Sequence, residues 1–336
     1  MQRCLDLAAL GLGRTYPNPM VGSVIVYQDR IIGEGWHQKA GNAHAEVNAV
    51  ASVKDKSLLK DSTMYVSLEP CAHFGKTPPC AELIIKNKIQ NVVVGCLDPF
   101  SEVSGKGIEM MRNAGLNVKV GVLEQDCKES HKRFFTFHKK LRPYIILKWA
   151  ETKDGFIAPF NQESGKPFWI TTLESKKLVH KWRTEEASIL IGTNTAENDN
   201  PSLTARLWAG NQPLRLIMDR SLRLPNNLNV FDESIKTLVF TEQSKENSGL
   251  TEYQVIDFNS IHQEIMDVLY QRRIHSVIIE GGQKTMQSFI DADLWDEARV
   301  FVGDTNLKKG VIAPQLKGQS VSEEYISTDL LKYYYR

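Results

Sequence analysis

Three short pieces of the N-terminal half could together bind a metal ion. His44-Ala45-Glu46 opens an expected helix, Pro70-Cys71 follows an expected strand, and Pro78-Pro79-Cys80 opens a second expected helix. One imidazole and two thiolates make a zinc site whose fourth position stays free for water, as in catalytic zinc sites. Thiolates near helix starts are also favoured by the positive end of the helix dipole. These residue types predict that His44, Cys71 and Cys80 bind one Zn²⁺ per chain.

Glu46 is expected to act beside this metal without binding it. It lies two residues after His44, so on a helix it points in a different direction. Zinc lowers the pKa of a bound water, which allows attack on an amidine-like ring carbon at neutral pH. Glu46 would take the proton of that water and deliver it to the departing amine. His-x-Glu followed by Pro-Cys and a second cysteine is typical of the zinc-dependent base deaminases, so Glu46 is the predicted catalytic residue.

Three other interpretations of these residues fit the sequence less well. A closed structural zinc site needs a fourth ligand, and His73 is the one competitor for that place. A nucleic-acid deaminase needs a basic groove, whereas 41 basic and 40 acidic residues give a formal net charge of +1. A zinc-containing module that senses a pyrimidine or a flavin would have no use for Glu46. The two cysteines lie nine positions apart, not three, so the loop between them is expected to have a function.

The elements around these residues predict an α/β fold. A chain of 336 residues suggests two domains, and its 42% hydrophobic and 24% charged residues are ordinary for a globular protein. Apolar, β-branched runs alternate with helical patterns in the first half, which predicts a sheet flanked by helices. The expected strands are 21–27, 64–68, 91–95 and 117–120, and the expected helices are 43–53, 81–87 and 106–113, with a closing helix after Gly121.

A basic, proline-terminated stretch at 138–143 predicts the boundary between domain 1–142 and domain 143–336. The alternation then restarts, which predicts a second α/β domain. Its expected strands are 144–149, 187–191, 214–218, 237–241 and 276–280, and its expected helices are 172–184, 261–272 and 285–292. Gly281-Gly282 follows the last of these strands, where a backbone without Cβ atoms could approach a phosphate at a helix N-terminus.

Cysteine usage and apolar runs predict the compartment. Five irregularly spaced cysteines argue against a secreted disulfide scaffold, and Cys4, Cys96 and Cys127 are expected to be small buried residues. No run approaches the ~20 apolar residues of a membrane span, and the first residues lack a signal-peptide pattern. We therefore expect a cytoplasmic protein that acts on a small molecule, with no nucleic-acid and no membrane partner.

The stretch 69–80, EPCAHFGKTPPC, resembles the signature of the bifunctional deaminase/reductases of riboflavin biosynthesis, the RibD family, and 16–22 and 41–46 fit as well. The resemblance implies a cytidine-deaminase-like α/β/α fold and makes the long loop between the cysteines an expected feature. It implies the same three zinc ligands and Glu46 as the proton shuttle. It also implies that Asn18, His73 and Lys76 hold the base and the phosphate of the substrate.

The second half resembles the family's reductase domain, a dihydrofolate-reductase-like α/β fold, over most of 144–305. The resemblance implies two groups of site residues. Those expected to contact NADPH are Trp169, Thr171, Thr195, Asp199, Gly281 and Gly282, and those expected to contact substrate are Lys148, Arg183, Leu203, Arg206 and Glu280. Lys153 stands where an apolar residue is usual, and 166–168 differ where a small hydroxyl residue is usual, so a deaminase with an inactive second half stays an alternative.

The resemblance also implies the reactions. The exocyclic amine at C2 of 2,5-diamino-6-(ribosylamino)-pyrimidin-4-one 5′-phosphate would be removed in a zinc-dependent hydrolysis. NADPH would then reduce the ribosyl group of 5-amino-6-(5-phosphoribosylamino)uracil to a ribityl chain, with hydride delivered to C1′. A homo-oligomer is a further implication of the resemblance.

Overall fold

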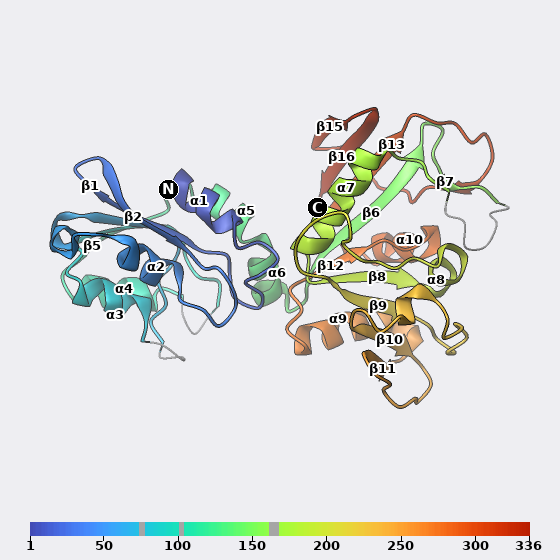
Figure 1. Ribbon diagram of the computed structural model, residues 1–336, viewed down its shortest axis with the longest axis horizontal. Coiled ribbons are helices and arrows are strands. Elements are labelled where there is room, and N and C mark those ends of the chain that lie inside the picture. The colour runs from blue at the N-terminus through green and yellow to red at the C-terminus, as the bar shows by residue number, and fades with distance from the viewer. Residues whose placement is uncertain (74–77, 101–103, 161–167) are drawn as a thin grey trace. The chain divides into compact units, whose positions relative to one another are not determined.

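A computed structural model of the protein describes residues 1–73, 78–100, 104–160 and 168–336 (Figure 1). It contains two compact units, Met1–Leu141 and Arg142–Arg336. Arg142 is in the second unit, one residue before the expected boundary, because its guanidinium donates to both carboxylate oxygens of Asp296 at 2.5 and 2.9 Å. Within the described part of the chain, every helix is too short or too polar to span a bilayer.

The first unit is built on a five-stranded sheet with the order β2-β1-β3-β4-β5. β1 is antiparallel to its two neighbours, whereas β3, β4 and β5 are mutually parallel. The strands are β1 (Gly22–Tyr27), β2 (Arg30–Trp36), β3 (Thr63–Leu68), β4 (Asn91–Cys96) and β5 (Asn117–Val120). The helices are α1 (Gln2–Ala9), α2 (Ala45–Ser52), α3 (Cys80–Lys86), α4 (Lys106–Asn113), α5 (Glu124–Ser130) and α6 (Lys132–Lys140), with a 3₁₀ turn η1 at Lys56–Asp61.

Two apolar layers enclose this sheet, which gives the predicted α/β/α arrangement. Side chains of α2, α3 and α4, including Val50, Ile84 and Met111, pack with strand residues into one core. Leu5 of α1 and Cys127 of α5 pack in a second cluster together with Leu68 and Cys96. Cys4, Cys96 and Cys127 are fully buried free thiols.

β2 was not predicted, because its sequence RIIGEGW lacks a regular apolar alternation. Its two glycines allow the strand to approach α2 closely. A Cβ at Gly35 would lie 2.3 Å from the backbone nitrogen of Ala49, and a Cβ at Gly33 would lie 2.6 Å from the Ala49 carbonyl oxygen. Glycine here therefore serves helix–sheet contact, which strand propensity does not capture.

The second unit is built on a nine-stranded sheet with the order β11-β10-β9-β8-β12-β6-β13-β16-β15. The strands from β11 to β13 are parallel, and β16 and β15 are added antiparallel at one edge. The strands are β6 (Tyr144–Thr152), β8 (Ser188–Gly192), β9 (Leu214–Met218), β10 (Thr237–Thr241), β11 (Thr251–Val255), β12 (Ser276–Ile279), β13 (Glu297–Gly303), β15 (Ser322–Ile326) and β16 (Asp329–Tyr335). A separate two-stranded ribbon joins β7 (Phe156–Ala158) to β14 (Val311–Ile312).

Helices cover both faces of this sheet (Figure 1). Met266 and Leu269 of α9 and Phe289 of α10 pack with Leu147 and Leu190 on one face. Val179 and Trp182 of α7 pack on the other. The helices are α7 (Leu173–Glu185), α8 (Thr193–Asp199), α9 (Ile261–Gln271) and α10 (Gln283–Asp291), with 3₁₀ turns η2 (Asn229–Phe231) and η3 (Phe258–Ser260). Ligands of open parallel sheets bind beyond the carboxyl ends of the strands, and β8 and β12 end at the N-termini of α8 and α10.

Candidate active sites

The three predicted metal ligands of the first unit lie together. Their ligand atoms are all within 4.8 Å of one another, and His44 Nδ1 is 3.3 Å from Cys80 Sγ and 3.6 Å from Cys71 Sγ. His44 is the N-cap of α2, Cys80 is the first residue of α3, and Cys71 follows β3. Two helix N-termini and a strand end therefore converge on one point. The donor set fits zinc with a position left for water.

The two cysteine sulfurs are coupled. A hydrogen bond from Cys80 lowers the pKa of the Cys71 thiol well below its usual range, and the same contact raises the pKa of Cys80. The backbone N–H of Cys80 also donates to Cys71 Sγ at 3.3 Å. Without metal, the pair therefore holds one proton and presents Cys71 as a thiolate, the form that binds metal.

Glu46, in the first turn of α2, is 3% exposed. Burial, together with the nearby charge of Cys71, raises the pKa of its carboxyl group to about 7. A carboxyl group of this pKa both accepts and releases a proton near neutral pH, as a proton shuttle must. Glu46 lies beside the cluster and is not a member of it, in keeping with the sequence argument.

His37 links Asn18 to this site, and sequence reasoning did not identify it. The side-chain nitrogen of Asn18 lies 3.1 Å from His37 Nε2, and His37 Nδ1 lies 3.1 Å from the carbonyl oxygen of Ala43. The His37 ring also packs edge-on against the ring of His44, with 5.6 Å between centroids. Its place just after β2, beside the strand that was missed, left no sequence signal. Asn18 is thereby held next to the metal ligands.

Two more residues, His73 and Lys76, were expected to contact the substrate of the deaminase, and the structure describes one of them. His73 is an exposed residue two positions after Cys71. Lys76 lies outside the described residues, within 74–77.

Glu69, directly before Pro70-Cys71, anchors the loop that leads to α4. Its buried carboxylate accepts backbone N–H groups of Asp98, Gly105 and Gly107 at 3.2, 3.0 and 3.0 Å. A Cβ at Gly107 would lie 2.0 Å from the Pro70 carbonyl oxygen, so the start of α4 contacts the backbone next to Cys71. These contacts fix the position of one zinc ligand.

The second unit contains a cavity of about 900 Å³. All of the predicted cofactor and substrate residues of this half line it, namely Lys148, Trp169, Thr171, Arg183, Thr195, Asp199, Leu203, Arg206, Glu280, Gly281 and Gly282. They come from β6, α7, α8, the 200–206 loop and the turn between β12 and α10, so the fold gathers residues from distant parts of the sequence.

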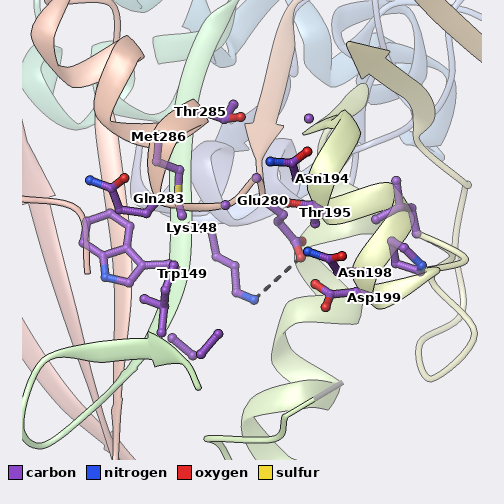
Figure 2. Close-up of a pocket in the computed structure, with 18 of the residues that line it drawn as sticks. Lys148, Trp149, Asn194, Thr195, Asn198, Asp199, Glu280, Gln283, Thr285 and Met286 are labelled. Atoms are coloured by element: carbon purple, nitrogen blue, oxygen red, sulfur yellow. Dashed lines mark ion pairs between the residues drawn. The ribbon is translucent and has the colours of Figure 1, made fainter. Parts of the chain in front are cut away.

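A charged group of three residues lies inside this cavity. Arg183 donates from Nε and Nη2 to the two carboxylate oxygens of Glu280, and Lys148 Nζ is 3.6 Å from Glu280 Oε2. Figure 2 shows the Lys148 side chain extending toward Glu280. Burial raises the pKa of Glu280, but the charges of Arg183 and Lys148 outweigh that effect and lower it to about 2. Burial lowers the pKa of Lys148.

The two glycines of the turn after β12 allow its backbone to lie close to neighbouring threonine side chains. A Cβ at Gly281 would lie 2.8 Å from Cβ of Thr285, and one at Gly282 would lie 3.3 Å from Oγ1 of Thr195. Gly282 is the N-cap of α10, whose first N–H groups are free to bind an anion. Thr195, Asn198 and Asp199 of α8 line the same cavity (Figure 2), and Thr195 is the one of them that contacts the turn. This side of the cavity suits the phosphates of a dinucleotide.

Lys153 and residues 166–168 are the positions where the sequence departs from the usual reductase pattern. Lys153 is exposed and pairs with Asp304, and it does not line the cavity. Phe168 does line it, whereas residues 166 and 167 lie outside the described part of the chain. Lys176 and His180 of α7 also line the cavity and were not predicted.

Comparison with known proteins gives a separate family match in each half of the chain. Residues 143–319 match the family model of the RibD C-terminal domain, and residues 1–96 match the cytidine and deoxycytidylate deaminase zinc-binding region. The chain is 40% identical over 329 residues to the riboflavin biosynthesis protein RibD of Aquifex aeolicus, with 96% of this chain and 91% of the relative covered. The chain belongs to the RibD family.

The match to the RibD family extends to solved structures. The crystal structure of a diaminohydroxyphosphoribosylaminopyrimidine deaminase/5-amino-6-(5-phosphoribosylamino)uracil reductase from Thermotoga maritima superposes with a TM-score of 0.89 at 39% identity, covering 99% of this chain and 96% of that one. RibD of Acinetobacter baumannii gives a TM-score of 0.87 at 31% identity, covering 99% and 96%. The predicted fold class is confirmed for both halves.

As a member of the RibD family, the chain is a bifunctional enzyme with a deaminase domain and a reductase domain. Zinc is the metal of its deaminase domain, where the His/Cys/Cys cluster lies, and NADPH is the reductant of its reductase domain. Because the relatives match nearly the whole chain, both activities are supported and the alternative of a deaminase with an inactive second half is set aside.

Proposed function

We propose that the chain acts twice on one pyrimidine ribotide. The deaminase domain removes the C2 amine of 2,5-diamino-6-(ribosylamino)-pyrimidin-4-one 5′-phosphate. The reductase domain then converts the ribosyl group of the aminouracil product to ribityl. The observation that carries this proposal is that one chain combines a buried glutamate beside a His/Cys/Cys cluster with a cavity lined by Lys148, Glu280 and two arginines.

In the deaminase domain, His44, Cys71 and Cys80 hold the metal, which when bound supplies a water of lowered pKa. Glu46 accepts the proton of the attacking water and passes it to the departing amine, so that ammonia leaves as a neutral molecule. Asn18, held by His37, orients the pyrimidine ring. His73 and Lys76 contact the base and phosphate.

In the reductase domain, bound NADPH supplies hydride for C1′ of the opened sugar. Trp169, Thr171, Thr195, Asp199, Gly281 and Gly282 hold this cofactor. Lys148 gives a proton to the sugar, because burial lowers the pKa of its ammonium group and so makes it a better acid. Glu280 keeps Lys148 in place. Leu203, Arg183 and Arg206 border the ribose phosphate, and guanidinium groups suit its oxygens.

The test is to assay both steps in one preparation. Purified protein is analysed for zinc, and ammonia release and NADPH oxidation are followed with the diaminopyrimidinone ribotide, for the wild type and for Glu46→Gln. We expect about one zinc per chain, ammonia release that falls at least about 100-fold in the variant, and NADPH oxidation by the variant when it is given the deaminated ribotide. Zinc-loaded wild type that releases no ammonia would overturn the assigned first reaction.

Assembly and location belong to the same proposal. The resemblance supports a homo-oligomer, the few irregularly spaced cysteines support a cytoplasmic location, and the balanced charge argues against a nucleic-acid partner. Light scattering of the purified protein tests whether it is a homo-oligomer. Deamination of an RNA oligonucleotide by the enzyme would contradict the absence of a nucleic-acid partner.

A further inference from the structure

His180 is a buried histidine with one free ring nitrogen. It lies on α7, is 2% exposed, and lines the reductase cavity. Its Nδ1 accepts the backbone N–H of Leu207 at 3.3 Å. A neutral imidazole with an accepting Nδ1 carries its hydrogen on Nε2. Among the described residues none hydrogen-bonds to Nε2, and this atom is not sealed from solvent, so its N–H is open to the cavity.

The surroundings keep this ring uncharged. Burial, together with the charges of Arg183, Arg206 and Lys176, lowers the pKa of His180 to about 4 against the opposing charge of Glu280. Lys176 is four residues before His180 on α7 and Arg183 is three residues after it, so all three lie on one face of the helix. His180 is thus a neutral donor surrounded by cations.

Two of these cations are available for a ligand. Arg183 is held by Glu280 and by the carbonyl oxygen of Thr204. Among the described carboxylates none forms an ion pair with Lys176 or Arg206, and Arg206 bonds to the hydroxyl of Thr204 at 3.1 Å. The Lys176 ammonium lies 3.8 Å from the centre of the Trp169 ring. Cations left without carboxylates beside a buried donor make a site for an anion.

The position of this group distinguishes the two ligands of the cavity. The glycine turn after β12 and the N-terminus of α10 suit the cofactor phosphates, and Thr195 lies on that side. Lys148 and Glu280 lie at the reacting sugar in the proposed function. The anion site is formed by α7, which carries Lys176 and His180, and by the loop that carries Arg206. Arg183 bonds to Thr204 of this loop and to Glu280, so it connects the loop to the substrate side of the cavity. An anion bound beside Arg183 and Glu280 would therefore belong to the sugar that is reduced.

Resting on the proposed function, we propose that His180 donates its Nε2–H to the phosphate of the ribotide and, with Lys176 and Arg206, forms the subsite that recognises this group. His180 is then a substrate-binding residue of the reductase. It acts by binding and takes no part in proton transfer at C1′.

The experiment compares His180→Asn with His180→Gln. The Asn side chain can replace Nδ1 but cannot reach the position of Nε2, whereas the Gln amide nitrogen can. We expect His180→Asn to raise the KM for the aminouracil ribotide about tenfold or more, with kcat and the KM for NADPH changed less than about twofold, and His180→Gln to recover most of the loss. Unchanged NADPH binding and melting temperature show that the second unit remains folded.

The matched control is the same substrate without its phosphate. Wild type and His180→Asn should use this ribosylaminouracil about equally well, because the contact that the variant lacks is absent from both reactions. An equal loss with both substrates, or no loss with the ribotide, would overturn the proposal.

Calorimetry with ribose 5-phosphate makes the test independent of turnover. We expect this probe to bind the wild type more tightly than His180→Asn, and equal affinities would refute the subsite. If the wild type binds ribose 5-phosphate but does not oxidise NADPH with the ribotide, the proposed reaction fails while the subsite stands.

Discussion

Arg183 and Glu280, 97 residues apart in the chain, are joined by two hydrogen bonds of 3.1 and 2.8 Å. The pair connects α7 to the residue that follows β12, and Lys148 of β6 shares the same carboxylate. Both partners are about nine-tenths buried. The contact therefore sets the distance between the two sides of the reductase cavity.

Removing this carboxylate should impair the second unit alone. Glu280→Gln leaves Arg183 and Lys148 buried without their counter-charge, and breaking such a pair costs about 3 kcal/mol or more of unfolding free energy. Because Lys148 also loses its anchor, NADPH oxidation should fall about 100-fold. Ammonia release by the same protein should stay near the wild-type rate.

A matched control for this variant is Glu242→Gln. It breaks the exposed ion pair between Arg220 and Glu242, which should leave stability and both activities unchanged. A Glu280→Gln protein that reduces its substrate at the wild-type rate would contradict the role of the buried carboxylate.

The same carboxylate predicts how the second unit responds to acid. Its pKa is lowered to about 2 in the folded chain, whereas an unfolded glutamate titrates near ~4.3. Since the folded pKa is depressed, the stabilisation is fully present above about pH 4.3 and is lost as the pH falls toward about 2, with a size of roughly 3 kcal/mol. Denaturant unfolding between about pH 6 and about pH 3 should show a smaller loss of stability for Glu280→Gln than for the wild type. An equal loss of unfolding free energy in the wild type and in Glu280→Gln over this pH range would contradict the lowered pKa of Glu280.

Zinc binding should depend on Cys71. Cys71→Ser replaces a thiolate by a hydroxyl, a far poorer zinc ligand, so zinc content and ammonia release should both be lost. NADPH oxidation with the deaminated ribotide should persist, because the reductase residues belong to the other unit. Metal analysis of this variant beside Cys96→Ala, a buried cysteine outside the cluster, checks the prediction. Full zinc content in Cys71→Ser would exclude Cys71 as a ligand.

Gly107 should be required for the position of Cys71. A methyl group at Gly107 would meet the Pro70 carbonyl oxygen, a backbone atom that cannot rotate away. Gly107→Ala should therefore lower the stability of the first unit by about 1–3 kcal/mol and weaken zinc binding. Glu109→Ala, an exposed change on the same helix, should do neither. Melting temperature and zinc retention during dialysis against a chelator measure both effects.

The sequence by itself determined the chemistry of the chain. His44 and Glu46 share a helix start, and Cys71 and Cys80 flank one loop, so their residue types and short spacings were enough to predict a zinc deaminase. Most of the parallel strands were also predictable, because buried strands are apolar throughout, but β11 and β13 were not predicted. The resemblance supplied the reductase residues, which the sequence alone offered only as isolated arginines and a glycine pair.

Only the tertiary structure decided how distant residues act together. β2 escaped prediction because its glycines serve contact with α2, and His37 at its end gained a role only when Asn18 and His44 lay beside it. The helix α7 was predicted, but the role of its His180 was not, because that role depends on the hydrogen bond from Leu207 that fixes the tautomer of the ring. Local propensity records the backbone preferences of neighbours in the chain, whereas these contacts depend on burial and hydrogen bonding between elements that the fold brings together.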